Sequence, residues 1–169
     1  MIVSASWRGK RFAVLGLARS GLAVSRALLS AGAQVTAWDA KDAVRATFYP
    51  DPAAAGTLTL ADPVEADLTG FSGVVVSPGV PINKHPIAAK ARAAGAPLIG
   101  DIELFAEARA GLPPHRVVGI TGTNGKSTTT ALIHHILDTA GTPARLGGNI
   151  GLPILGQEAL PGGGVYVLE

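Results

Sequence analysis

Cysteine is absent from the sequence, which excludes disulfide bonds, cysteine-ligated zinc and thiol nucleophiles. Charged residues are scarce at 15%, whereas an average globular chain has roughly 25%. Hydrophobic residues make up 47%, so intrinsic disorder is excluded, because disordered chains combine few apolar residues with high net charge. The net charge is only +2, which provides no strongly basic face, and we expect no nucleic-acid partner.

Long apolar runs are also missing, and none reaches the length of about 18 residues that a transmembrane helix requires. Three basic residues, Arg8, Lys10 and Arg11, precede a short apolar run at 12–15, an arrangement similar to the start of a signal peptide. Arg19 soon interrupts the pattern, and no cleavage site of small residues follows. We therefore expect a cytoplasmic protein with no membrane partner.

Glycine and proline divide the chain into short units, whose apolar patterns predict alternating strands and helices. Residues 42–67 are rich in proline, alanine and threonine, and predict only one weak strand, at 57–60. Asp101 is the expected N-cap of a helix. The other strands of this part are expected at 11–15, 34–38, 74–76 and 98–99, and its helices at 20–31, 87–94 and 101–110.

The pattern starts again after a predicted linker at 111–114, with strands at 117–121 and 165–168 and a helix at 126–140. The apolar stripe of that helix consists of Leu132, Ile133, Ile136, Leu137 and Ala140. Because strands and helices alternate throughout, the expected fold class is α/β, doubly wound, with parallel sheets. The first part is Rossmann-like.

A glycine motif, GLARSG at 16–21, lies between the first strand and the first helix. Its spacing is that of a dinucleotide-binding turn, in which helix amides face a phosphate. Ala18 replaces the second glycine of that fingerprint, which favours a nucleotide other than NAD. Asp39 ends the next strand, where an acid can bind a ribose hydroxyl. An alternative interpretation of the same residues is a strand-to-helix turn that needs glycine only for its backbone conformation and binds no nucleotide.

A second and more specific motif, GITGTNGKST at 119–128, also joins a strand to a helix, as a phosphate-binding loop does. Backbone amides from Gly122 to Lys126 can surround an anion. Lys126 would reach the β- and γ-phosphates, and Ser127 would ligate Mg²⁺. The first glycine, Gly119, stands one residue earlier than in the strict pattern. Glu169 ends an apolar strand beside this loop, which suits a metal ligand, although a solvated acid is equally consistent with the sequence.

The loop TGTNGKST resembles the ATP-binding loop of the Mur ligases, the ATP-dependent amino-acid ligases of peptidoglycan synthesis, which use this relaxed spacing. Further similar segments follow in the same order along nearly the whole chain, except at 42–67. They are LGLARSGLA, VVVSPGVP, GDIELF, GGNIGLP and YVLE. The resemblance is strongest to the members that add D-glutamate to UDP-N-acetylmuramoyl-L-alanine.

The resemblance implies a role for individual residues. It makes Lys126 and Glu169 catalytic, with Ser127 and Glu169 as ligands of Mg²⁺. The ATP-binding residues would be Gly122, Thr123, Asn124, Gly125, Lys126, Ser127 and Thr128. The residues that bind the UDP substrate would be Arg19, Ser20, Asp39, Ala40, Lys41, Ser77, Pro78, Gly79 and Asn149.

The resemblance also implies an activity and a domain organisation. The reaction would be ATP-dependent addition of D-glutamate to UDP-N-acetylmuramoyl-L-alanine through an acyl phosphate, as part of cell-wall synthesis and cell division. The expected domains are a Rossmann-like domain for the UDP substrate at 1–99, a helix and linker at 100–114, and the start of a P-loop ATP-binding domain at 115–169. We expect a monomer, and we expect this chain alone to be an inactive part of a ligase that binds its UDP substrate only weakly.

Three other interpretations account for some of these residues. A related Mur ligase for another amino acid is one, although GDIELF argues against it. An NAD-dependent oxidoreductase is another, but it leaves the loop at Lys126 unexplained. The third is a nucleotide-binding module without catalysis.

Three further residues are expected to have structural positions only. His115 is expected in a linker, and Trp7 and Trp38 are expected in the core.

Overall fold

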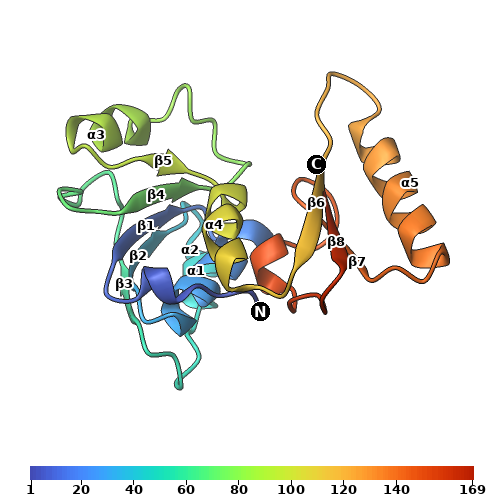
Figure 1. Ribbon diagram of the computed structural model, residues 1–169. Helices are drawn as coiled ribbons and strands as arrows, with labels where there is room; N and C mark the ends of the chain where they lie inside the picture. The colour runs from blue at the N-terminus through green and yellow to red at the C-terminus, as the bar shows by residue number, and fades with distance from the viewer.

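The computed structural model describes residues 1–169 and contains two parallel β-sheets flanked by helices (Figure 1). The first sheet has the strand order β3-β2-β1-β4-β5, and the second has the order β6-β8-β7. The strands are β1 (Arg11–Leu15), β2 (Gln34–Trp38), β3 (Thr57–Leu60), β4 (Gly73–Val76), β5 (Leu98–Ile99), β6 (His115–Gly119), β7 (Ala144–Gly147) and β8 (Gly164–Leu168). The predicted α/β class with parallel sheets is confirmed.

Helices cover both faces of the first sheet. The helices are α1 (Arg19–Ser30), α2 (Asp42–Ala46), α3 (Ile87–Ala93), α4 (Asp101–Ala108) and α5 (Lys126–Thr139), with short 3₁₀ turns η1 (Ala5–Trp7), η2 (Arg109–Gly111) and η3 (Ile154–Gly156). Side chains alternate along β1, so that Phe12 and Val14 pack with α1 and α4, while Ala13 and Leu15 pack with α3. The sheet is therefore buried on both faces, as parallel sheets usually are.

The second sheet lies between α5 on one side and α4 with η3 on the other (Figure 1). Its central strand, β8, is buried along its whole length. The flanking strands pair with it in register, Gly119 opposite Leu168 from one side and Gly147 opposite Leu168 from the other. The carboxyl ends of all three strands therefore meet at one edge of this sheet.

One continuous core of 23 buried residues joins the two sheets. At its centre the ring of Tyr166 on β8 packs edge-on against Phe105 of α4, with centroids 4.9 Å apart. The Trp7 indole nitrogen donates a hydrogen bond to the Glu107 carboxylate at 2.9 Å. Near the N-terminus, the Ile2 amide donates to the Leu155 carbonyl at 3.0 Å. The Tyr166–Phe105 contact holds the central strand of the second sheet against α4, while the other two contacts join the N-terminal residues to α4 and η3.

Tyr166 also makes a polar contact whose loss can be measured. Its hydroxyl accepts a hydrogen bond from the buried Leu160 amide at 2.9 Å. Tyr166→Phe would leave that amide without a partner, and we expect the free energy of unfolding to fall by about 1–3 kcal/mol. Tyr49→Phe is the matched control, because Tyr49 is 76% exposed. Equal midpoints of urea unfolding for the two variants would contradict this expectation.

Several elements differ from the sequence-based expectations. Helix α2 and strand β7 were not predicted, and β6 begins at His115 rather than at 117. His115 is therefore a strand residue and not a linker residue, and its ring packs edge-on against Tyr166 at 5.1 Å. The N-cap of α4 is Gly100, whose amide donates to the Glu103 carboxylate at 2.8 Å, so the expectation for Asp101 was wrong. Asp101 is the first residue of the helix, and burial raises the pKa of its carboxyl.

Helix α5 forms where it was expected, but most of its surface remains exposed. Leu132 is 54% and Ile136 is 56% exposed, so the predicted apolar stripe is only partly covered. None of the helices combines the length and the hydropathy needed to cross a lipid bilayer.

Candidate functional site

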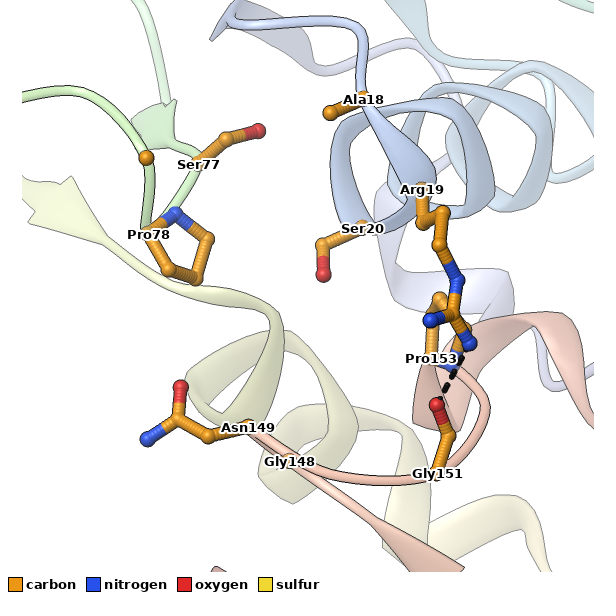
Figure 2. A pocket seen from close by; sticks show the side chains of 10 residues that line it. Ala18, Arg19, Ser20, Ser77, Pro78, Gly148, Asn149, Gly151 and Pro153 are labelled. Atoms are coloured by element: carbon orange, nitrogen blue, oxygen red, sulfur yellow. Dashed lines mark hydrogen bonds between the residues drawn. The ribbon is translucent and has the colours of Figure 1, made fainter.

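A pocket of about 250 Å³ opens where the first sheet meets the loop after β7. Six of the nine residues predicted for the UDP substrate line it, namely Arg19, Ser20, Ser77, Pro78, Gly79 and Asn149. They come from the start of α1, the loop after β4 and the loop after β7, three segments that are far apart in the sequence. In Figure 2 the α1 residues and the Ser77–Pro78 turn stand on opposite sides of the opening, with Asn149 below them.

The start of α1 supplies the positive end of a helix to this pocket. Its N-cap, Ala18, makes no side-chain hydrogen bond to the first turn, which leaves backbone amides available. The turn before the helix is very tight, because a Cβ on Gly21 would lie 1.8 Å from the Gly16 carbonyl oxygen. The Ser77 hydroxyl donates to the same carbonyl at 2.8 Å. Free amides and the helix dipole together favour an anion such as a phosphate group.

Arg19 is exposed, and its side chain reaches the loop after β7 on the other side of the pocket. Its guanidinium donates to the Gly151 carbonyl at 2.6 Å, as the dashed line in Figure 2 shows. This contact joins the first helix to the loop that carries Asn149. It also holds a positive charge beside the start of α1, where it adds to the attraction for an anion.

A second pocket, of about 410 Å³, adjoins the first and shares Ala18, Ser77 and Gly79 with it. The three remaining residues predicted for the UDP substrate, Asp39, Ala40 and Lys41, line this pocket. Its walls also include the apolar side chains of Leu15, Trp38, Val80 and Pro81. A flat, partly apolar group fits such walls, while the polar groups at the rim can orient it.

Asp39 has a role that the sequence did not predict. One carboxylate oxygen accepts from the Leu17 amide at 2.8 Å, and the other accepts from the Lys41 amide at 2.9 Å. Leu17 lies in the loop after β1 and Lys41 in the loop after β2, so Asp39 ties the two loops together. A side chain that bridges two loops in this way was not visible from the spacing of Asp39 alone.

The phosphate-loop motif forms an open turn between β6 and α5. The Ile120 amide donates to the Leu168 carbonyl at 2.8 Å, which anchors the start of the loop to β8. Gly125 caps the helix with a φ of +75°, a left-handed conformation that favours glycine. Of the predicted ATP-binding residues, Lys126 is half-buried at the first position of α5 and the others are exposed. The Thr130 hydroxyl donates to the Lys126 carbonyl at 2.8 Å and supports this first turn.

Glu169 lies directly after β8, beside the start of the loop. Its amide donates to the Gly147 carbonyl at 3.1 Å, and its own carbonyl accepts from the Asn149 amide at 3.4 Å. Gly148, at a φ of +96°, is required here, because a Cβ would lie 2.3 Å from the Glu169 carbonyl oxygen. Oε2 of Glu169 is buried and has no hydrogen-bond partner. A buried carboxylate oxygen needs a partner, and a magnesium ion is one that could supply it.

No cluster of three or more histidine or acidic side chains accompanies Glu169. A magnesium ion usually takes only one or two carboxylates from the protein and completes its shell with water and substrate phosphates. One buried carboxylate oxygen next to a phosphate loop therefore fits the donor set that Mg²⁺ prefers.

These features define an α/β protein with two adjoining pockets at a Rossmann-like sheet and a glycine-rich loop of the phosphate-binding type on a second sheet. The chain belongs to the Mur ligase family. Residues 10–100 match the Mur ligase MurD-like N-terminal domain, and residues 120–169 match the Mur ligase middle domain. The family resemblance found in the sequence is thereby confirmed, and an NAD-dependent oxidoreductase is no longer a competing interpretation.

Curated relatives align along the whole chain. It is 70% identical to a protein of Novosphingobium aromaticivorans, 63% to one of Sphingopyxis alaskensis and 56% to one of Zymomonas mobilis, with 100% of this chain covered in each case. Each of the three is named UDP-N-acetylmuramoylalanine--D-glutamate ligase. The alignments cover 37%, 38% and 40% of these relatives, so the chain spans well under half of their length.

Proposed function

We propose that this chain provides the UDP-substrate site and the phosphate loop of an ATP-dependent ligase that joins D-glutamate to UDP-N-acetylmuramoyl-L-alanine. The observation that carries the proposal is the convergence of nine residues. Arg19, Ser20, Asp39, Ala40, Lys41, Ser77, Pro78, Gly79 and Asn149 line two adjoining pockets, although they come from four separate segments. The names of the aligned relatives support the same substrate and amino acid.

The two pockets suit different parts of a UDP-linked sugar. The pocket at Asp39 has apolar walls that suit uracil and polar groups that suit ribose. The pocket at the start of α1 suits the diphosphate, since helix amides and Arg19 surround it. Asn149, on the opposite loop, would then contact the muramoyl part.

The phosphate loop would hold ATP through the amides of residues 122–126, the Lys126 ammonium and the side chains of Ser127 and Thr128. Ser127 and the buried Oε2 of Glu169 would hold Mg²⁺. When bound, the ion would neutralise charge on the phosphates. Lys126 would orient the terminal phosphate and offset its charge as the carboxylate of the UDP substrate attacks it.

That attack breaks the bond between the β- and γ-phosphates, releases ADP and gives an acyl phosphate, from which the amine of D-glutamate then displaces phosphate to form the amide. The contribution of this chain is to bind and align the two phosphorylated substrates, and such alignment accounts for much of the rate in phosphoryl transfer. We assign substrate binding to residues 1–99, the connection to 100–114 and the first part of the ATP domain to 115–169. The use of ATP and a UDP-linked substrate favours a reaction in the cytoplasm. The 169 residues alone would bind substrate without forming the amide.

Binding of UDP-N-acetylmuramoyl-L-alanine to this chain tests the proposal. A ligand present at 100 times its Kd stabilises the folded state by about 2.7 kcal/mol, which raises the midpoint of thermal unfolding by several degrees. No change in the midpoint at millimolar substrate would refute the proposed substrate site.

Asn149→Ala provides a sharper version of this test. The Asn149 side chain is exposed, so its removal should not affect folding. We expect the variant to bind UDP-N-acetylmuramoyl-L-alanine roughly three- to tenfold more weakly, since a typical hydrogen bond is worth about 0.5–1.5 kcal/mol. Binding of UDP alone should not change. Asn83→Ala, another exposed asparagine outside both pockets, should bind both ligands like the unsubstituted chain.

A further inference from the structure

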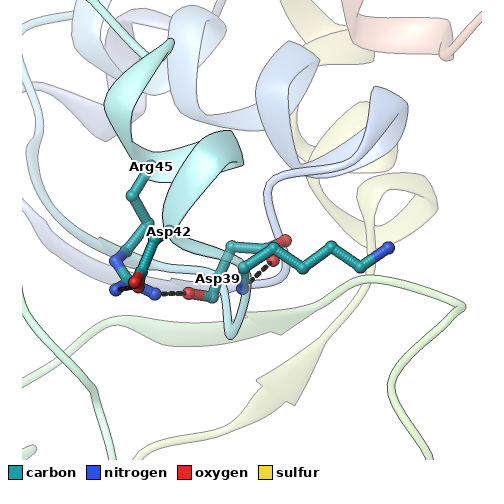
Figure 3. Close-up of polar contacts among 4 residues, drawn as sticks. Asp39, Asp42 and Arg45 are labelled. Carbon is teal, nitrogen blue, oxygen red and sulfur yellow. Dashed lines mark hydrogen bonds and ion pairs between the residues drawn. The ribbon is translucent and has the colours of Figure 1, made fainter.

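A small polar cluster lies behind the second pocket, where α2 follows β2. The Arg45 side chain reaches back from α2, and one guanidinium nitrogen donates to the main-chain carbonyl of Asp39 (Figure 3). Another nitrogen of the same group pairs with the Asp42 carboxylate. The guanidinium carbon also stands over the Trp38 ring, 3.8 Å from its centroid. Arg45 is only 20% exposed in these contacts, whereas Asp42 is 90% exposed.

Asp39 is consequently held at both ends. Arg45 holds its carbonyl, while its carboxylate binds the amides of Leu17 and Lys41 at 2.8 and 2.9 Å. The side chains of Ala40 and Lys41 are exposed, and the Lys41 carbonyl accepts from the Val44 and Arg45 amides at 3.0 and 3.2 Å as α2 begins. The main-chain geometry of residues 39–41 therefore depends on this first turn together with the contacts made by Asp39 and the Arg45 side chain.

Arg45 does not itself line the pocket, but the residues that it holds do. Trp38, Asp39, Ala40 and Lys41 form one wall of the 410 Å³ pocket. A shift of the Asp39 carbonyl would move this wall relative to the opposite wall, which Ser77, Val80 and Pro81 form. Binding sites require supporting residues of this kind, because small displacements of the contacting groups reduce affinity.

We propose that Arg45 is a positioning residue for the uracil and ribose end of the UDP substrate, acting through Trp38 and the Asp39 carbonyl. This inference rests on the proposed function of the pocket. Arginine suits the position because its planar guanidinium can stack on an indole and donate hydrogen bonds from its edge at the same time. A lysine ammonium has no plane to stack on the indole, so it matches this pair of contacts less well. The ion pair with Asp42 contributes little, because it is largely exposed to solvent.

Titration with UDP, followed by calorimetry, measures the effect on the site. We expect Arg45→Ala to raise the Kd for UDP about tenfold, and Arg45→Lys to restore less than half of the lost affinity on a logarithmic scale. Asp42→Ala should bind within about twofold of the unsubstituted chain, since Arg45 keeps its contacts to Asp39 and Trp38. Arg116→Ala, which removes an exposed arginine on the second sheet, is the matched control and should also bind normally.

Amide hydrogen exchange without ligand separates positioning from general stability. Arg45→Ala should speed exchange at the Leu17 and Lys41 amides about tenfold, while amides of β8 should exchange as before. Unchanged exchange at Leu17 and Lys41, or an unchanged Kd for UDP, would refute the role of Arg45. If the unsubstituted chain fails to bind millimolar UDP, the proposed function of the pocket is refuted instead, and the exchange rates still report whether Arg45 orders the loop.

Discussion

Lys126→Ala should weaken binding of ATP with magnesium by about one to two orders of magnitude. Lys126 is the first residue of α5 and follows the left-handed Gly125, so its side chain starts at the end of the loop, at the positive end of the helix. A hydrogen bond to a charged group contributes about 1.5–3 kcal/mol, which corresponds to a factor of roughly 10–150 in affinity. The measurement is a titration of this chain with a fluorescent ATP analogue in the presence of Mg²⁺.

The control for this substitution is Lys10→Ala. Lys10 is exposed and precedes β1, far along the chain from the phosphate loop, and it carries the same charge. Its removal should leave ATP affinity unchanged, so a loss confined to the Lys126 variant identifies a local contact rather than a change in net charge. Equal affinities for the two variants would contradict the assignment of the loop to ATP.

The strand, loop and helix of the phosphate-loop motif were predictable because their signal is local. A strand, a glycine-rich turn, a lysine and a helix follow one another between residues 115 and 139, and no contact with a distant residue is needed to recognise them. The same holds for the turn at 16–21. Parallel sheets followed from the alternation of strands and helices, and the strand at 57–60, expected from a weak pattern, is present as β3.

Other features depend on contacts that no short segment reveals. Helix α2 has only five residues, too few for an amphipathic pattern to emerge. Strand β7 reads Ala-Arg-Leu-Gly and becomes a strand because β8 pairs with it. The Asp39 carboxylate joins two loops only because it meets the amide of Leu17, which is distant in sequence. The positioning role proposed for Arg45 likewise follows only from the contacts that its side chain makes. The apolar stripe of α5 predicted a helix correctly, but an apolar pattern does not specify what covers it.

Gly21→Ala should destabilise the fold more strongly than the loss of the Tyr166 hydroxyl does. An alanine Cβ would lie 1.8 Å from the Gly16 carbonyl oxygen, 2.9 Å from the Gly16 carbonyl carbon and 2.8 Å from the Ser77 hydroxyl oxygen. Two of these three atoms belong to the backbone, so no side-chain rotation relieves the overlap. The loop after β1 would have to move away from α1, and we expect unfolding free energy to fall by about 3 kcal/mol or more.

Gly162→Ala is the matched control for this prediction, because no heavy atom lies within 4 Å of the added Cβ. It should unfold within about 0.5 kcal/mol of the unsubstituted chain in guanidinium chloride.

In the Gly21→Ala variant, the displacement of the loop after β1 would also separate Ala18 and Arg19 from Ser77 on the facing wall of the pocket. Any folded Gly21→Ala protein should therefore also bind UDP more weakly, even though glycine has no side chain to contact a ligand. Normal stability in this variant would show that the turn can relax, and that its glycine does not set the geometry of the anion site.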